Sequence, residues 1–328
     1  MGATVQGQTD GKLKIGMYWA SSCGGCDISL LEIGPRILDL IKVADVVLWP
    51  CAADFKYRDV AGYADGYMDV CFYNGGIRSS EQEEIARLLR QKSKTLIAYG
   101  ACAVGGGIPA LANLKSRAEI YDVVYHQNPT IDNRGGVVPE PLHEVPQGEL
   151  ELPEFYPAVL RLKDVVPVDY EIPGCPPQAD RVWESIQAVV SGAVPPRNAA
   201  VRVGCTGKSV CDECSKEKRL VKIKAFRRHH QFRPEPGWCL LEQGILCMGP
   251  ATRSGCGALC LKADMACEGC YGPPPNAEDQ GTCMVGALGT LLDASTEDRA
   301  REMVAEIADP TGTFYRFSLS SSFMKLGK

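Results

Sequence analysis

Short apolar runs alternate with segments of helical periodicity through the first half of the chain. The runs predict strands at residues 12–20, 44–49, 68–73, 95–100 and 165–172. Between them, residues 27–43 have helical spacing with a break midway, and Ser80 with Glu83 is predicted to form a capping box that opens a helix ending at Lys94. Strands that alternate with helices indicate an α/β fold, a flavodoxin-like doubly wound parallel sheet.

The second half lacks this alternation and is dense in cysteine. The chain contains 16 Cys and only 4 His, and ten of the cysteines lie between residues 205 and 283. A boundary is expected near residues 191–198, where the sequence SGAVPPRN interrupts the pattern. We therefore expect three regions, namely a flavodoxin-like domain at 12–192, a loop-rich, Cys-dense domain at 199–290, and a C-terminal helix and tail at 291–328.

Composition places the chain among ordinary soluble proteins. It has 328 residues, 45% hydrophobic and 23% charged, with a net charge of -5, and a protein that mainly binds nucleic acid would usually be basic. The sequence contains no apolar run long enough for a membrane span, and residues 1–16 lack signal-peptide and twin-Arg patterns. A cytoplasmic location is expected, where thiols stay reduced, so clustered cysteines favour metal sites over disulfides.

Four cysteines follow predicted strands of the first half. They are Cys23, Cys26, Cys102 and Cys175. Because ligands of such sheets bind beyond the carboxyl ends of the strands, these thiols are expected to meet at one edge. Thiolates are the ligands of iron-sulfur clusters, so the sequence predicts a four-Cys cluster site there. The alternatives are a thioredoxin-like pair or half a zinc site at Cys23 and Cys26.

Two further sets of four cysteines lie in the second half. The compact set is Cys256, Cys260, Cys267 and Cys270, in a ferredoxin-like grouping. The looser set is Cys211, Cys214, Cys239 and Cys247, with Cys205 as a possible substitute. Irregular spacings favour iron-sulfur clusters, and zinc ribbons are the alternative. The remaining thiols, Cys51, Cys71 and Cys283, are predicted to be core residues, as is the alternative for Cys260.

The motifs of the chain, taken in order, resemble a known family. They are ASSCGGCDISLLEIG, YGACAVGGGIP, IPGCPP, SVCDEC, GWCLLEQGILCMGP and SGCGALCLKADMACEGCYGPP. Residues 12–290 thereby resemble the small subunit of nickel-iron hydrogenases. The resemblance implies three 4Fe-4S clusters: a proximal one on Cys23, Cys26, Cys102 and Cys175, a medial one on Cys256, Cys260, Cys267 and Cys270, and a distal one on Cys211, Cys214, Cys239 and Cys247. It also implies an oxidoreductase complex whose nickel-iron site lies on a separate large subunit, so that this chain carries no catalytic residue and conducts electrons.

Two positions narrow the resemblance to a subgroup. Cys211 stands where membrane-bound and periplasmic members usually have His, and Cys260 fills a position where they often lack Cys. The chain looks closest to the cytoplasmic methyl-viologen-reducing type, which implies a further electron-accepting iron-sulfur or flavoprotein subunit of the heterodisulfide reductase type. The alternatives are the small subunit of a deazaflavin- or NADP-reducing cytoplasmic hydrogenase, and a complex I type electron-transfer subunit, which would lack the Cys-dense half.

Residues 216–233 form a basic segment, with eight Lys and Arg against one Glu. The segment contains few aromatic residues for stacking on bases, which favours a solvated face or a docking site for an acidic partner over nucleic-acid binding. His229 and His230 are expected at the surface. The tail is predicted to form a helix at residues 295–308, followed by a stretch with no chemical signal that is a candidate for partner docking.

Overall fold

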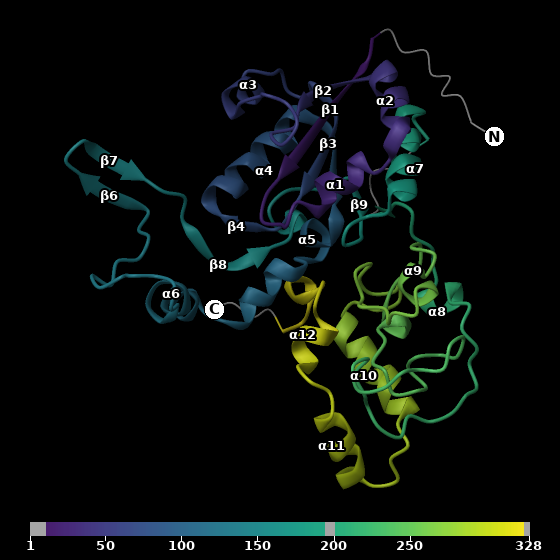
Figure 1. Cartoon of the computed structure of the whole chain (residues 1–328). Helices are drawn as coiled ribbons and strands as arrows, with labels where there is room; N and C mark the ends of the chain where they lie inside the picture. The colour runs from purple at the N-terminus through teal and green to yellow at the C-terminus, as the bar shows by residue number, and fades with distance from the viewer. Residues whose placement is uncertain (1–10, 194–200, 325–328) are drawn as a thin grey trace.

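A six-stranded parallel sheet forms the centre of the protein (Figure 1). The computed structural model describes residues 11–193 and 201–324. The strand order is β10-β9-β5-β3-β1-β2, and each neighbouring pair is parallel. The strands are β1 (Leu13–Trp19), β2 (Ala44–Leu48), β3 (Met68–Asn74), β5 (Ser93–Tyr99), β9 (Tyr170–Ile172) and β10 (Val201–Arg202). The predicted doubly wound α/β fold is confirmed.

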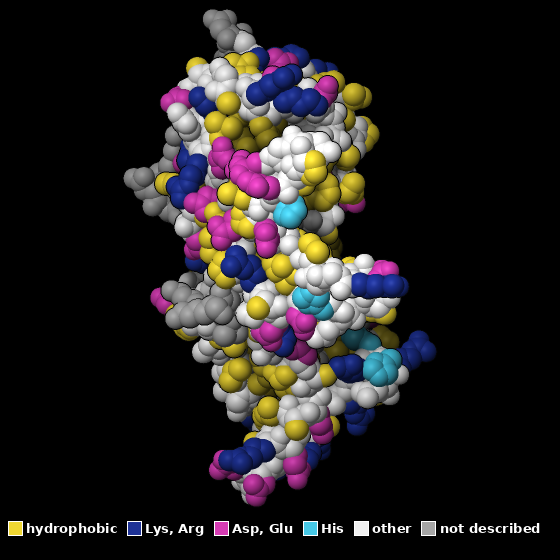
Figure 2. Space-filling model, turned by 90° about the vertical axis from the view of Figure 1, so that its left-hand side faces the viewer, with side chains coloured by type: hydrophobic (Ala, Val, Ile, Leu, Met, Phe, Trp, Pro, Cys, Tyr) yellow, Lys and Arg dark blue, Asp and Glu magenta, His cyan; other side chains and the backbone are white. Residues whose placement is uncertain are grey.

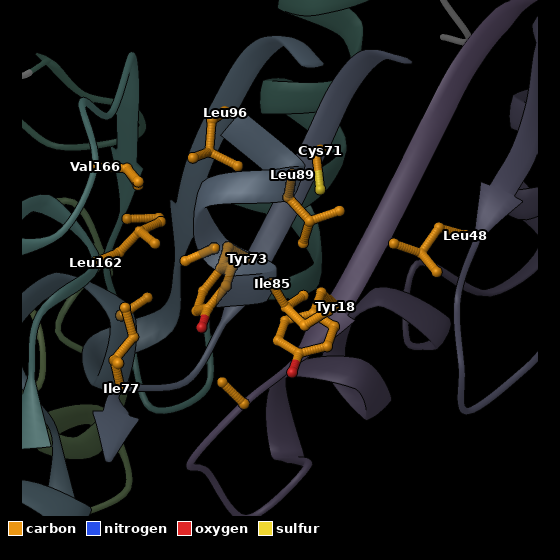
Figure 3. Packing of buried hydrophobic residues seen from close by; sticks show 14 of the residues in the cluster. Tyr18, Leu48, Cys71, Tyr73, Ile77, Ile85, Leu89, Leu96, Leu162 and Val166 are labelled. Atoms are coloured by element: carbon orange, nitrogen blue, oxygen red, sulfur yellow. The ribbon is translucent and has the colours of Figure 1, made fainter. Parts of the chain in front are cut away.

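Helices cover both faces of this sheet. Successive strand residues point to opposite faces, so Tyr73 and Phe72 of β3 belong to two different cores. Figure 3 shows the first core, in which Tyr18 and Tyr73 pack near Ile85 and Leu89 of a helix. On that face lie α3 (Tyr57–Ala61), α4 (Ser80–Lys92) and α5 (Gly100–Gly105), and on the other α1 (Gly25–Leu31), η1 (Gly34–Arg36), α2 (Ile37–Val43) and α7 (Ala179–Val190).

The predicted cap of α4 is wrong by one residue. Ser79, not Ser80, is the N-cap, and its hydroxyl accepts a hydrogen bond from the Gln82 N–H at 3.4 Å. The Gln82 side chain accepts in return from the Ser79 N–H at 3.3 Å. Glu83 does not take part in the cap, and its carboxylate instead accepts hydrogen bonds from Arg87 and from the Tyr156 hydroxyl. The helix ends at Lys92 because β5 begins at the next residue.

An excursion between β5 and β9 was not indicated by the sequence pattern. Its strand β8 pairs antiparallel with β4, and its hairpin β6-β7 projects away from the sheet in Figure 1. The helices and strands of this excursion are short, and few of its residues are buried. β4 (Ile77–Ser79) lies earlier in the chain, before α4. The elements of the excursion are η2 (Ile108–Leu114), α6 (Arg117–Tyr121), η3 (Asp122–Gln127), β6 (Leu142–Val145), β7 (Gly148–Glu151), β8 (Phe155–Leu160) and η4 (Leu162–Asp164).

The cysteine-rich part has its own core and little regular structure. Val210, Ile223, Leu240 and Met284 are among its buried residues. The last residues return to the first part, where the Ser320 hydroxyl donates to the Val159 carbonyl at 2.6 Å. The elements are α8 (Val210–Glu213), η5 (Gly249–Ala251), α9 (Leu259–Lys262), α10 (Gln280–Leu291), α11 (Glu297–Ala305), α12 (Pro310–Phe314) and η6 (Leu319–Ser321).

The helix predicted at residues 295–308 is thus confirmed as α11. The boundary predicted at residues 191–198 lies partly, and the N-terminal residues 1–10 lie wholly, outside the described residues. Within the described ranges no helix is both long and apolar enough to cross a bilayer. On the face drawn in Figure 2, basic and acidic side chains are interspersed. The limits of the three predicted regions stay a prediction.

Candidate iron-sulfur sites

Four thiols meet beyond the carboxyl ends of the central strands, and we call them the proximal group. Cys23 and Cys26 follow β1, Cys102 lies in α5 directly after β5, and Cys175 follows β9. Burial raises the pKa of the Cys26 thiol, and the neighbouring thiols of Cys102, Cys175 and Cys23 raise it further. Burial also raises the pKa of Cys102 to about 12. Four thiols crowded in this way would repel one another as thiolates, and bound iron cations would remove that repulsion.

The backbone around the proximal group suits a cluster. At Gly100, where φ is 85°, a Cβ atom would overlap the Cys26 sulfur, and at Gly107 a Cβ atom would lie 2.5 Å from the Cys102 sulfur. The N–H of Gly25 donates to the Cys23 sulfur at 3.4 Å. Close backbone approach and N–H donors to sulfur are features of iron-sulfur sites. The residues present therefore fit a cluster held by four thiolates.

The looser set from the sequence is also brought together, and we call it the distal group. Burial raises the pKa of the Cys211 thiol to about 12, with contributions from the thiols of Cys247, Cys239 and Cys214. Burial raises the pKa of Cys247 to about 11, although N–H groups of Gly249 and Cys267 that donate to its sulfur lower it. These donors would stabilise a thiolate, as cluster ligation requires.

The compact set, which we call the medial group, lies between the other two. Burial raises the pKa of the Cys270 thiol to about 12, and the thiols of Cys256, Cys175 and Cys260 add to the rise. Burial raises the pKa of Cys267 far above its usual range, and Cys270 is one of its neighbours. Cys260 is exposed, so it is not a core thiol.

Backbone contacts connect the three groups in one order. The N–H of Cys175 in the proximal group donates to the sulfur of Cys270 in the medial group. The N–H of Cys267 in the medial group donates to the sulfur of Cys247 in the distal group at 3.4 Å. The order proximal, medial, distal is therefore a spatial sequence of touching residues.

Among residues 11–193 and 201–324, no three His, Cys, Asp or Glu side chains converge closely enough to hold a single metal ion.

Cys205 lies in a different place from the one considered in the sequence. It neighbours Cys256 of the medial group, with Arg202 and Arg253 also close, and burial raises its pKa to about 11. Its neighbours do not include the distal thiols, whereas those of Cys211 do. The geometry therefore favours Cys211 over Cys205 in the distal group.

The three thiols predicted to be core residues differ from one another. Cys71 on β3 is buried, which confirms its prediction, and Cys283 is half-buried. Cys51 is exposed, so its prediction is wrong. The physical reason is the turn at Pro50, which follows β2 and carries the chain to the surface. There Cys51 lies close to the carboxylate of Asp27.

Two carboxylates that support the groups were missed in the sequence. Asp27 is buried and accepts hydrogen bonds from Trp49 Nε1 and Asn74 Nδ2, each at 2.9 Å. Glu213 accepts from the N–H groups of Gly255 at 2.9 Å and Gly257 at 3.0 Å, which fixes the turn around Cys256. Their only sequence signal is position, since each adjoins a cysteine of a predicted group.

The chain resembles known proteins along nearly its whole length. Residues 23–189 match the family described as NADH ubiquinone oxidoreductase, 20 Kd subunit. The iron-sulfur subunit of the F420-non-reducing hydrogenase of Archaeoglobus profundus is 35% identical over 95% of this chain and 98% of that protein. The chain belongs to this family of F420-non-reducing hydrogenase subunits. The corresponding vhu hydrogenase subunit of Methanocaldococcus jannaschii is 36% identical, over 95% of this chain and 96% of its own length.

Solved structures agree with this family in fold. The [NiFeSe]-hydrogenase of Dm. baculatum matches with a TM-score of 0.52 at 18% identity, covering 81% of this chain and 96% of the matched one. The 20 Kd subunit match ends at residue 189, before the cysteine-rich part, whereas the relatives from F420-non-reducing hydrogenases cover that part as well. The predicted resemblance to hydrogenase small subunits is confirmed, and this subunit is part of an oxidoreductase.

Proposed function

We propose that this hydrogenase subunit relays electrons through three 4Fe-4S clusters between a nickel-iron large subunit and an electron-accepting partner. The proximal cluster would be held by Cys23, Cys26, Cys102 and Cys175, the medial cluster by Cys256, Cys260, Cys267 and Cys270, and the distal cluster by Cys211, Cys214, Cys239 and Cys247. When bound, such clusters take up and release single electrons. Membership of a hydrogenase small-subunit family implies the large-subunit partner.

One observation carries this proposal most directly. The thiol groups touch one another in a single file, through the Cys175 contact with Cys270 and the Cys267 contact with Cys247. A file of closely spaced redox centres suits electron transfer, whereas a zinc-stabilised scaffold has no need of it. The N–H donors along the file would tune the potentials of the bound clusters.

The surface near the proximal group supports a large-subunit interface there. Cys23 and Cys175 are exposed, and so are the apolar side chains of Trp19, Ile28 and Leu31. Exposed apolar residues beside a cofactor site are typical of a surface that a partner covers. An electron from the nickel-iron site would thus enter at the sheet and leave at the distal group.

We further propose a partner of the heterodisulfide reductase type as the electron acceptor. This part rests on the similarity to F420-non-reducing hydrogenases, whose name says that they do not reduce the deazaflavin F420. The cytoplasmic location stays a prediction from the sequence.

Anaerobic affinity purification of the tagged chain tests the proposal. We expect a brown complex that contains a nickel-bearing large subunit and heterodisulfide reductase subunits, and that reduces methyl viologen with dihydrogen. A colourless zinc protein, or a complex without dihydrogen-dependent dye reduction, would refute the relay. Another set of accepting subunits would refute only the acceptor.

A further inference from the structure

We propose that the loop at residues 217–222, beside the distal group, is the docking surface for an acidic iron-sulfur protein that accepts the electrons. We call these residues the 217–222 loop. The inference rests on the proposed function, because it names the partner surface at the exit of the relay. In Figure 1 the chain after α8 runs along the outer side of the lower part, away from the sheet.

The loop presents one large apolar side chain to solvent. Leu220 is 89% exposed and has a φ of 57°, in the left-handed region that leucine rarely adopts. Its neighbour Val221 is also exposed. Exposure and an unfavourable backbone conformation together are hard to explain by the stability of the isolated subunit. Burial of Leu220 in a complex would explain both.

The loop is held in this conformation by a carboxylate. The N–H groups of Arg219 and Leu220 donate to the two oxygens of Glu242 at 2.8 and 2.9 Å. Trp238 Nε1 donates to the same carboxylate at 2.7 Å, and the Arg219 guanidinium lies 4.6 Å from the Trp238 ring centre. Leu220 is therefore pre-organised, which lowers the entropy lost when a partner binds.

The same contacts join the loop to the distal thiols. The N–H of Cys239 donates to the Glu217 carbonyl at 2.8 Å, and the N–H of Glu242 donates to the Cys239 sulfur. Lys218 Nζ donates to the carbonyl of Cys211 at 3.2 Å. A partner that contacts Leu220 would therefore lie next to the segments that contain Cys239 and Cys211 of the distal group.

Charge identifies the kind of partner. The whole chain has a net charge of -5, yet residues 216–233 contain eight Lys and Arg and one Glu. The ammonium groups of Lys218 and Lys222 donate to backbone carbonyls and form no ion pair within the described residues. Arg219 is paired with the carboxylates of Glu217 and Glu235, so the positive charge beside Leu220 that lacks an ion pair among the described residues is that of Lys218 and Lys222. Two such ammonium groups beside an apolar side chain fit a partner with a small apolar socket flanked by carboxylates.

The test uses the complex of this chain with its large subunit, without the heterodisulfide reductase type subunits that would cover the exit, and an acidic low-potential ferredoxin as the probe. Leu220→Gly removes the side chain and suits the left-handed backbone, so the loop should keep its shape. We expect the KM for ferredoxin in dihydrogen-driven reduction to rise about tenfold, with methyl viologen reduction unchanged. The matched control is Leu142→Gly, which removes an exposed leucine from the β6-β7 hairpin and should leave both activities unchanged. Lys222→Gln should weaken the dependence of the ferredoxin rate on salt.

Binding supplies a second measurement that needs no electron transfer. A ferredoxin with gallium in place of iron should bind the wild-type complex at low salt, and the Leu220→Gly complex about tenfold more weakly. No binding to wild type, or equal binding to both complexes, would overturn the docking surface. If the wild-type complex did not reduce viologen with dihydrogen, that result would instead refute the proposed relay.

Discussion

The proximal group and the cysteine-rich half position their thiols in different ways. Each proximal thiol follows a strand whose side chains are buried between two layers of helices. In the cysteine-rich half, α8 and α9 have four residues each, and isolated bridges such as Ile223 with Leu292 replace a sheet. Cys247 and Cys267 are themselves part of that core. We therefore expect the first site to rest on a fold that forms without iron, and the second region to depend on the clusters that its cysteines would hold.

The largest expected effect is on electron transfer through the proximal group. Cys175→Ser removes a thiolate at the start of the file, so dihydrogen-driven viologen reduction should fall by at least about a hundredfold. Cys283→Ser, which changes a half-buried thiol outside the three groups, should keep full activity. Hydrogen isotope exchange at the nickel-iron site should persist in a correctly assembled Cys175→Ser complex. Normal dye reduction by that complex would remove Cys175 from the relay.

Removal of iron should affect the amide protection of the two regions differently. In the apo subunit, amide hydrogens of β1, β3 and β5 should stay protected from exchange, because their cores contain no proposed ligand except Cys26 and Cys102. Residues 205–291 should lose most of their protection, since short helices without their metal centres are not stable. Mass spectrometry of deuterium uptake in holo and apo subunit measures this. Uniform protection in both forms would show that the cysteine-rich half folds independently of its clusters.

A single methyl group should disturb the proximal group alone. In Gly100→Ala the new Cβ would overlap the Cys26 sulfur at a positive φ, so the subunit should lose the proximal cluster, about 4 iron atoms. The control Gly286→Ala adds its Cβ to open space on α10 and should retain all the iron. Iron analysis of the two purified variants compares them. Full iron content in Gly100→Ala would mean that the close approach is not required.

The smallest expected effect concerns the contact between the two regions. Glu171 on β9 is only 2% exposed, and it accepts from Lys163 at 3.0 Å and from Arg202 at 2.8 Å. Arg202 also donates to the Tyr271 carbonyl, next to a medial thiol. Glu171→Gln leaves these cations without a charged partner and should lower the free energy of unfolding by about 3 kcal/mol. Asp39→Asn, which breaks the exposed pair with Lys42, should change it by less than about 1 kcal/mol.

The same carboxylate should give a pH signature. Burial raises the pKa of Glu171, but Arg202 and Lys163 outweigh burial and leave it below its usual range. A lowered folded pKa means that this stabilisation is present above the unfolded value, near 4.3, and disappears as the pH falls through the folded value. Denaturation of the anaerobic holoprotein between pH 7 and 3 should show a weaker acid dependence in Glu171→Gln. If the stability of the two proteins fell equally between pH 7 and 3, Glu171 would not be the source of this acid dependence.

The sequence predicted the sheet and the neighbourhoods of the thiols because both follow from short-range patterns. Buried parallel strands appear as apolar runs, and strand ends share an edge, so Cys102 and Cys175 could be placed together. The excursion with the β6-β7 hairpin was missed because its residues are mostly exposed and carry no apolar period. The exposure of Cys51, the location of Cys205 and the supporting bonds of Glu213 depend on tertiary contacts. No local pattern records those contacts.

The central proposal is that three 4Fe-4S clusters stand in single file in this subunit. Mössbauer spectroscopy of the iron-57-labelled subunit, purified anaerobically and oxidised, measures the number and type of clusters together. We expect about 12 iron atoms per chain, all in 4Fe-4S clusters, including one that uses Cys260 as its fourth medial ligand. A 3Fe-4S component in the undamaged protein would contradict the role of Cys260. An iron content of about 8 or fewer would contradict the three-cluster file itself.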